Sequence, residues 1–521
     1  MTRTDPTRAA SRRAAAAVAF IAALATACAA SAESLGDAIS LAYQSNPTLL
    51  AARADLRALD ERYVQARAAL GPTAGVSEQH SFDDSDVDQA ASIFGPARTA
   101  RQTATTDTAQ LLVSQPLYAG GQLETAVNAA HAEVRAGREN LRQQEAVVLN
   151  TVITAYADVL LWQNLQTIAR QNVELLNQQL AEAEAKFAVK ENTLTDRAQA
   201  RARLAAARNS FVQARAGFAD AQARYLAAVG VAPGQLEPLP DLPGIPPSVD
   251  DAFDAAGRAN PQILAAVYTE QASRARVAQA KASDGLRVSV SVALSQQPAA
   301  PYVRDQNVRG VVASVTVSKS LFTSGDHVSR VHEAIEVNNS DDQKLSAQQR
   351  QVVAAVAQAW GDLAARREQL TGLRDQLENE EQAFRGARIE ERIGLRTTID
   401  VLNAEQEFQS TKVALAQAFH DEYLNRVNLL AAMGLLQAEL LQPDIQPYRP
   451  EQNLERRTLL SRAMPWESLV MALDSIGAPH LAANRLTGEL TESQRPPGGS
   501  AMPPAPQWSD LAKYLIDPTG G

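Results

Sequence analysis

The sequence contains a single cysteine, Cys28, so it excludes both a disulfide framework and a cysteine-based metal site. The six histidines are scattered, and the closest pair, His327 and His332, is not spaced to share one helix face. We therefore expect no metal ion and no cofactor. Basic residues are outnumbered, 49 against 59 acidic ones, which argues against nucleic acid as a partner. No nucleophile–base set and no phosphate-binding glycine loop is present, so an enzyme is not expected.

Residues 1–32 have the organisation of an export signal peptide. A basic start precedes a short apolar run, Ala14–Ala27, and the small residues Ala30–Ala32 follow, so cleavage after Ala32 is predicted. The apolar run is too short and too rich in alanine to span a membrane. An alternative is a lipoprotein with Cys28 as the lipidated residue, although the residues before it are a poor version of the leucine-containing signal. No later segment has 18 consecutive apolar residues, so the exported chain is periplasmic, secreted or a transmembrane β-barrel.

Two tandem copies organise the rest of the chain. The segment NPTLLAA at 46–52 returns as NPQILAA at 260–266, and SQPLYAGG at 114–121 returns as SKSLFTSG at 318–325. We predict repeat one at 33–236, a proline-rich linker at 237–248, repeat two at 249–442 and a proline-rich tail at 443–521. Each repeat is expected to open with one helix of about 36 residues, Leu35–Leu70 and Val249–Ala282.

Two strand-like segments follow in each repeat. Apolar and polar residues alternate strictly over Arg287–Ser295 and again over 311–317, whereas the first copy alternates less cleanly near 108–114 and weakly over Thr73–Ser81. Each run has the length of a strand that crosses a bilayer at a tilt. Four strands cannot close a barrel, so the chain must assemble. Two chains would give eight strands around a filled interior, and three would give twelve around a lumen.

A very long helix is predicted next, with a returning helix after it. Over Gln122–Phe187 apolar residues recur at steps of three and four, which is typical of a coiled-coil seam. The chain then turns near Thr193 and returns as a helix to Val229, and the second copy turns near Thr397. Both turns have the spacing Thr-x-x-Asp, which predicts a capping box at the start of each returning helix.

These features resemble the TolC family of outer-membrane efflux and secretion proteins over roughly residues 34–442. The motifs that carry the resemblance are SQPLYAGG, AYADVLLW at 155–162, TLTDRAQARARLAAA at 193–207 and GLRTTIDVLNAEQEF at 394–408. The resemblance implies a mainly α fold with a transmembrane β-barrel. In that fold three chains form a twelve-stranded barrel, four strands per chain, which continues into a long α-helical coiled-coil barrel.

The resemblance also implies a function and partners. The family is an exit duct from the periplasm through the outer membrane, and it works with a periplasmic adaptor (membrane fusion) protein and an inner-membrane ABC or proton-driven transporter. Expected contacts are therefore a homotrimer, these two proteins and outer-membrane lipid. The poor lipidation signal places the chain closest to the type I protein secretion branch. A proton-driven multidrug efflux role is the alternative, and a periplasmic coiled-coil adaptor without lipid-facing strands is the third.

By the same resemblance, the entrance of the duct is closed by links between helix tips. Thr195, Asp196 and Arg396 fall on link positions, and Glu391 stands at a link position that is aromatic in the family. For Asp196 the alternative role, as a helix cap only, is equally open. Arg396 is expected to pair with an acid on a neighbouring tip, with Asp196 as the candidate.

The entrance of the family also carries a ring of acidic residues. Asp400 falls on this ring by resemblance, and the ring role is favoured over a cap alone. The second ring aspartate corresponds to Asn403, so this ring is expected to carry less charge.

The tail after Gln442 is unlike either repeat. Its composition favours disorder. The alternative is that its two amphipathic pieces, Trp466–Ile476 and Trp508–Ile516, pack around the waist of the helical barrel or bind a partner.

Overall fold

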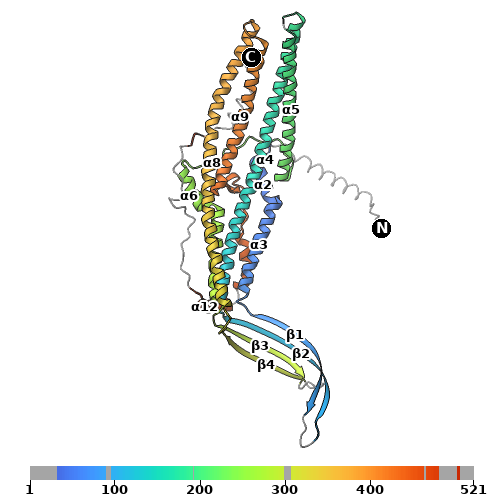
Figure 1. Cartoon of the computed structure of the whole chain (residues 1–521), viewed down its shortest axis with the longest axis vertical. Coiled ribbons are helices and arrows are strands. Elements are labelled where there is room, and N and C mark those ends of the chain that lie inside the picture. The colour runs from blue at the N-terminus through green and yellow to red at the C-terminus, as the bar shows by residue number, and fades with distance from the viewer. Residues whose placement is uncertain are drawn as a thin grey trace, which may run out of the picture.

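The computed structural model describes residues 32–89, 95–191, 193–298, 307–462, 465–479 and 502–504. Long helices run side by side over a four-stranded sheet, and their tips lie at the end farthest from the sheet (Figure 1). The predicted signal peptide up to residue 31 and the piece Trp508–Ile516 lie outside the described residues. Cleavage after Ala32 therefore stays a prediction.

The two repeats contain the same six elements in the same order. In the first these are α2 (Leu35–Ser45), α3 (Pro47–Ala68), β1 (Thr73–Gln89), β2 (Arg98–Tyr118), α4 (Gln122–Ala188) and α5 (Leu194–Val229). In the second they are α6 (Val249–Ala259), α7 (Pro261–Ala282), β3 (Arg287–Pro298), β4 (Asn307–Ser318), α8 (Asp326–Arg392) and α9 (Thr398–Met433). The helices α4 and α8 have 67 residues each and α5 and α9 have 36 each, which confirms the predicted long and returning helices.

Each opening helix is broken in two, which corrects the prediction of one continuous helix of about 36 residues. The break lies at Asn46 in the first repeat and at Asn260 in the second. The Asn46 N–H closes α2 on the Ala42 carbonyl at 2.8 Å, and its Oδ1 accepts a hydrogen bond from the Thr48 N–H at 3.0 Å. Asparagine thus ends one helix and caps the next. Proline is favoured directly after it because a first-turn residue needs no N–H partner.

The four strands form one antiparallel sheet in the order β1-β2-β3-β4. The first hairpin is longer than predicted, with strands of 17 and 21 residues against 12 and 12 in the second. The extra length carries four aspartates between 83 and 88, which interrupt the apolar alternation on which the prediction rested. The longer strands of repeat one therefore extend its hairpin beyond the apolar part of the sheet.

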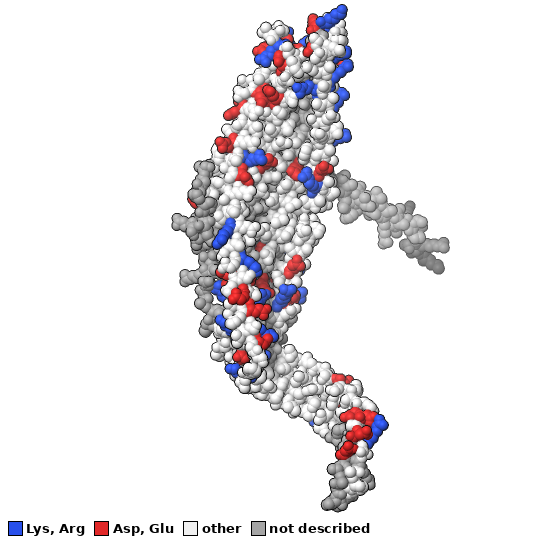
Figure 2. Space-filling view, viewed as in Figure 1, with Lys and Arg blue, Asp and Glu red and all other residues white. Residues whose placement is uncertain are grey.

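One face of the sheet is apolar and the other is small and polar. Directly paired residues point to the same face, so the register defines rows across all four strands. Two neighbouring rows of one face are Val76–Leu111–Leu294–Val311 and Ala74–Val113–Val292–Ala313. A row of the other face is Thr73–Ser114–Ser291–Ser314. An apolar outside and a polar inside are typical of a transmembrane barrel wall. The band of sheet next to the helices shows few charged side chains (Figure 2).

The long helix α4 is the centre of the helical packing. It contacts α3, α5, α7 and α9. Gly137 allows α3 to approach closely, because a Cβ there would lie 2.5 Å from Leu59 Cδ1. An 18-residue stretch of α4 is apolar enough to cross a membrane by length and composition, yet 56% of it is buried inside the chain. This stretch belongs to the helical core.

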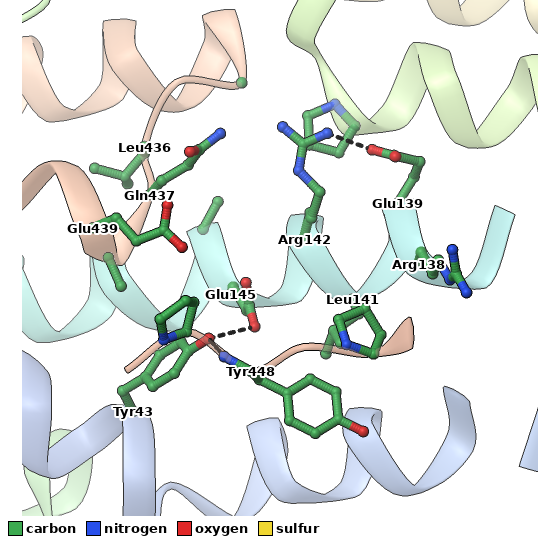
Figure 3. Close-up of a pocket in the computed structure, with 16 residues that line it drawn as sticks. Tyr43, Arg138, Glu139, Leu141, Arg142, Glu145, Leu436, Gln437, Glu439 and Tyr448 are labelled. Carbon is green, nitrogen blue, oxygen red and sulfur yellow. Dashed lines mark hydrogen bonds and ion pairs between the residues drawn. The ribbon is translucent and has the colours of Figure 1, made fainter. Parts of the chain in front are cut away.

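The largest hydrophobic core lies at the waist, where α2, α6 and α10 (Ala438–Leu441) pack on the long helices. A cavity opens beside it between α2, α4 and the chain that follows α10 (Figure 3). Tyr43 donates a hydrogen bond of 3.1 Å to Glu145 and accepts one of 3.1 Å from the Tyr448 N–H. Burial raises the pKa of Glu145, and the Tyr43 hydroxyl partly offsets this. These contacts attach the start of the tail to the helical wall.

Part of the tail is ordered, so the expectation of a disordered tail is wrong for these residues. Helix α11 (Glu451–Arg462) packs on α3, and α12 (Pro465–Ser475) packs on β2 and α4 at the foot of the sheet. Farther along, the Pro503 carbonyl accepts a hydrogen bond of 2.8 Å from Arg367. The first amphipathic piece therefore packs on the chain, at the junction of sheet and helices rather than at the waist.

Candidate entrance constriction at the helix tips

Both helical hairpins turn with the same backbone motif. After α8, the N–H groups of Gly394 and Leu395 bond to the carbonyls of Glu391 and Glu390 at 3.0 and 2.8 Å. This Schellman motif satisfies carbonyls that the end of a helix leaves free, and it needs a residue with positive φ. Gly394 supplies it with φ +78°.

The first hairpin has the same hydrogen bonds with a lysine in place of the glycine. The N–H groups of Lys190 and Glu191 bond to the carbonyls of Phe187 and Lys186 at 3.1 and 2.9 Å. Lys190 therefore has φ +66°, a conformation that costs a side chain about 1 kcal/mol. The tip of the first hairpin stores strain that the tip of the second lacks.

The returning helices begin as the Thr-x-x-Asp spacing predicts. Thr193 Oγ1 accepts a hydrogen bond from the Asp196 N–H at 3.2 Å, and Asp196 Oδ2 accepts one from the Thr193 N–H at 2.9 Å. In the second repeat Asp400 Oδ2 accepts hydrogen bonds from the Thr397 N–H at 3.1 Å and its hydroxyl at 2.7 Å. Thr193 and Asp196 thus exchange hydrogen bonds in both directions, whereas at Thr397 the side-chain bonds run to the Asp400 carboxylate.

Asp400 keeps its negative charge in this arrangement. The hydrogen bonds from the Thr397 side chain and backbone lower the pKa of the Asp400 carboxyl. The carboxylate also sits at the N-terminus of α9, where the helix dipole favours an anion. Its place in a ring around an axis stays a prediction, and so does a link role for Thr195, which is exposed at the tip of α5.

Arg396 has a partner within its own hairpin. Its Nε lies 2.6 Å from Glu390 Oε2, and about half of each side chain is exposed. Such an exposed pair contributes about 1 kcal/mol or less. Asp196 is held in the capping box of the other hairpin. The pair between Arg396 and Asp196 stays a prediction.

Glu391 joins the two hairpins of one chain. Its carboxylate lies 2.5 Å from Lys186 Nζ, and this ion pair connects the end of α8 with the end of α4. The position that is aromatic in the resembled family therefore holds an ionic contact here.

A second contact between hairpins involves Asn403. Arg203 of α5 donates a hydrogen bond of 2.9 Å to Asn403 Oδ1 and another to Gln406, both on α9. Asn403, which stands where the family has an acidic residue, thus has the guanidinium of Arg203 beside it. Two residues farther along α9, Glu405 is buried, and burial raises its pKa to about 7. Sequence reasoning missed Lys186, Arg203 and Glu405. The opposite charges of Lys186 and Glu391, at equivalent ends of the two long helices, could have predicted their ion pair.

The tips therefore carry charged side chains, and ion pairs hold several of them in place. Among the described residues no group of three His, Cys, Asp or Glu side chains is placed to hold a metal ion.

The sequence profile described as "Outer membrane efflux protein" matches residues 38–231 and 253–435, one range in each repeat. The chain belongs to the outer membrane efflux protein family. It is 30% identical over 426 residues to "Outer membrane efflux protein BepC" of Brucella suis, covering 81% of this chain and 90% of that one. It is 23% identical to "Outer membrane protein TolC" of Escherichia coli over 81% of this chain and 89% of that one.

Solved structures of the same fold include the CmeC outer membrane channel of Campylobacter jejuni. The TM-score is 0.69 at 14% identity, over 82% of this chain and 89% of that one. This outer membrane efflux protein therefore has the predicted fold class, that of trimeric channels with four strands per chain and two tandem repeats.

Membership in the family decides the location and the broad role. The chain is an outer-membrane efflux channel of tripartite systems, with a large periplasmic helical part, and its family is one of channels rather than enzymes. The alternative of a periplasmic adaptor required a chain without lipid-facing strands, and the apolar face of the sheet contradicts it.

Proposed function

We propose that this chain forms the passive exit duct of a tripartite system for type I protein secretion. It would receive cargo from an inner-membrane transporter through a periplasmic adaptor. The two-faced sheet supports the duct, because its outer strands β1 and β4 leave edges that lipid cannot satisfy. Three chains supply twelve strands around a lumen. The 67-residue helices carry that lumen about 100 Å away from the membrane.

To test the oligomeric state, the protein is extracted in mild detergent and the mass of the complex is measured by native mass spectrometry. We expect a homotrimer that resists dissociation in SDS without heating. A monodisperse monomer would contradict the duct architecture.

The proposed cargo rests on the segment before Cys28, which lacks the leucine-containing lipidation signal. Deleting the gene should remove specific proteins from the culture medium, and plasmid-borne protein should restore them. Efflux of small molecules is the second candidate, and it is favoured by the similarity to BepC, which is named an efflux protein. In that case the deletion strain would accumulate fluorescent dyes while its secreted proteins stay unchanged.

The orientation of the duct follows from the sheet. We propose that the connections from β1 to β2 and from β3 to β4, at the end of the sheet away from the helices, face the cell exterior. Epitope tags between β1 and β2 should be reached by antibody on intact cells. If the tags are labelled only after the outer membrane has been permeabilised, these connections face the periplasm and the proposed orientation is wrong.

A further inference from the structure

We propose that α12 is a membrane-interface helix, whose outward face lies in phospholipid on the periplasmic side of the outer membrane. The proposal rests on the outer-membrane location of the chain and adds a lipid-contacting surface outside the β-sheet.

Helix α12 exposes its apolar face and buries its charged residues, which is the opposite of a helix on a water-facing surface. Trp466, Leu469, Leu473 and Ile476 recur at steps of three and four, which places them on one helix face. That face is exposed, with Leu469 57% and Ile476 79% accessible. The only two charged residues of the helix, Glu467 and Asp474, are buried on the opposite side. A helix that faces water has the reverse arrangement.

The buried charges have partners in the body of the protein. Glu467 lies 2.5 Å from Arg67 Nε at the end of α3. Asp474 accepts four hydrogen bonds from backbone N–H groups around the start of α4. Between them, Val470 packs with Leu70 and Val127. The inward face is therefore fixed, and the apolar face must point away from the protein.

The register of the sheet places α12 on its apolar side. After a register shift between Pro116 and Tyr118, Tyr118 pairs with Val288, which belongs to the apolar face of β3. Gly477, just after α12, packs so tightly against the Tyr118 hydroxyl that a Cβ would not fit. At the other end, Trp466 Nε1 lies next to Gly71, in the turn between α3 and β1. The helix thus lies across the foot of the first two strands.

Lipid is the occupant that fits this position. Helix α12 lies at the level where the strands join the long helices (Figure 1), and it packs on β2 and α4 there. Tryptophan is enriched at this level of membrane proteins, because its ring is apolar and its N–H is polar. A helix that lies flat at the interface buries its apolar face by several ångströms into the headgroup boundary.

Site-directed spin labelling tests the proposal on the full-length trimer. In a Cys28→Ala background, nitroxides are attached at Leu469→Cys and, separately, at Leu473→Cys, and the protein is reconstituted into vesicles of phosphatidylethanolamine and phosphatidylglycerol. We expect oxygen, which concentrates in lipid, to collide with these labels several-fold more than a water-soluble nickel chelate does. Glu455→Cys on the exposed side of α11 is the matched aqueous control and should show the opposite ratio.

Two outcomes would overturn the proposal. The labels at Leu469→Cys and Leu473→Cys would match the Glu455→Cys control if the face is in water. They would be shielded from both reagents, and cysteines there would cross-link between chains, if a neighbouring protomer covers α12. Ile476→Cys, beyond the end of the helix, provides a third label if either leucine variant fails to assemble. Loss of the trimer in the unlabelled protein would instead contradict the duct itself.

Discussion

Asp474 Oδ1 accepts a hydrogen bond of 3.0 Å from the backbone N–H of Gly121, 353 positions earlier in the chain. The same carboxylate also accepts the N–H groups of Ala119, Leu123 and Glu124 at 2.6, 2.9 and 3.1 Å. Helix α4 follows a glycine and has no side-chain cap from its own sequence. The tail therefore supplies the cap of the longest helix in repeat one.

Replacing this cap should destabilise the junction of sheet and helices. Asp474→Asn keeps the shape but removes the charge and one acceptor, so buried N–H groups lose partners. We expect a loss of about 2 kcal/mol in the stability of the junction, measured as a lower dissociation temperature of the trimer on SDS gels. Asp444→Asn, at an exposed position of the same tail, should leave that temperature unchanged. Equal temperatures for the two variants would contradict the capping role.

Lys190→Gly should stabilise the tip of the first hairpin. Glycine adopts the left-handed conformation without the steric cost that the lysine side chain incurs, so a gain of about 0.5–1 kcal/mol is expected. Slower hydrogen exchange of the backbone amides at 189–191 would report it. Lys190→Ala is the control, because alanine retains the steric cost and should bring no gain. Faster exchange in the glycine variant would show that the lysine side chain itself holds the tip.

The stability of the helical wall should fall as pH rises through neutrality. Burial disfavours the charged His420 ring, yet its hydrogen bonds to Asp158 and Asp421, at 2.9 and 3.1 Å, outweigh burial and raise its pKa. A raised pKa stabilises the folded state fully below about pH 6.5, the value in the unfolded chain, and this stabilisation disappears above the folded value.

His420→Gln should therefore flatten the pH dependence of the melting temperature between pH 5.5 and 8.5. His332→Gln, at an exposed position of α8, should keep the slope of the unaltered protein. An unchanged slope in His420→Gln would assign the pH dependence to another group.

Arg396→Ser should raise single-channel conductance in planar bilayers. The substitution removes the guanidinium that is predicted to pair with Asp196 on a neighbouring tip, and it also breaks the pair with Glu390, so the closed entrance should loosen. Arg385→Ser removes a similar exposed pair, with Glu381, farther from the tip and should not change conductance. An equal rise in both variants would point to a general loss of helix stability.

Asp400→Asn should lower cation selectivity and weaken block by trivalent cations. Three carboxylates near one axis attract cations, and the depressed pKa of Asp400 keeps them charged in mildly acidic solution. Reversal potentials in a salt gradient measure the effect, with Asp375→Asn on the exposed side of α8 as the control. Unchanged selectivity would leave the helix cap as the sole role of Asp400.

The periodicity of apolar residues predicted the long helices well, but it did not predict which side chains pair across the structure. The seam of α4 persists over many turns, so its end was predicted within one residue, at Phe187 rather than Ala188. The break at Asn46 was missed because an apolar period continues through it. The long β1 was underestimated because its distal aspartates do not alternate. Partners such as Lys186 for Glu391 are 205 positions apart, and periodicity holds no information on such pairs.

Among the residues that the structure describes, no side chain caps α8 as Asp474 caps α4. Helix α8 begins after Gly325 with no side-chain cap, and a Cβ at Gly325 would meet no atom within 4 Å, whereas Gly121 is packed against Ala478. A trimer of this chain has six connections from a strand to a long helix. The three that lead into α4 are capped by Asp474, and the three that lead into α8 have no such cap. The helical tube should then bend most easily where the three uncapped α8 helices leave the barrel. The two repeats of three chains give the tube six similar strand-to-helix connections, but its flexibility would have threefold symmetry.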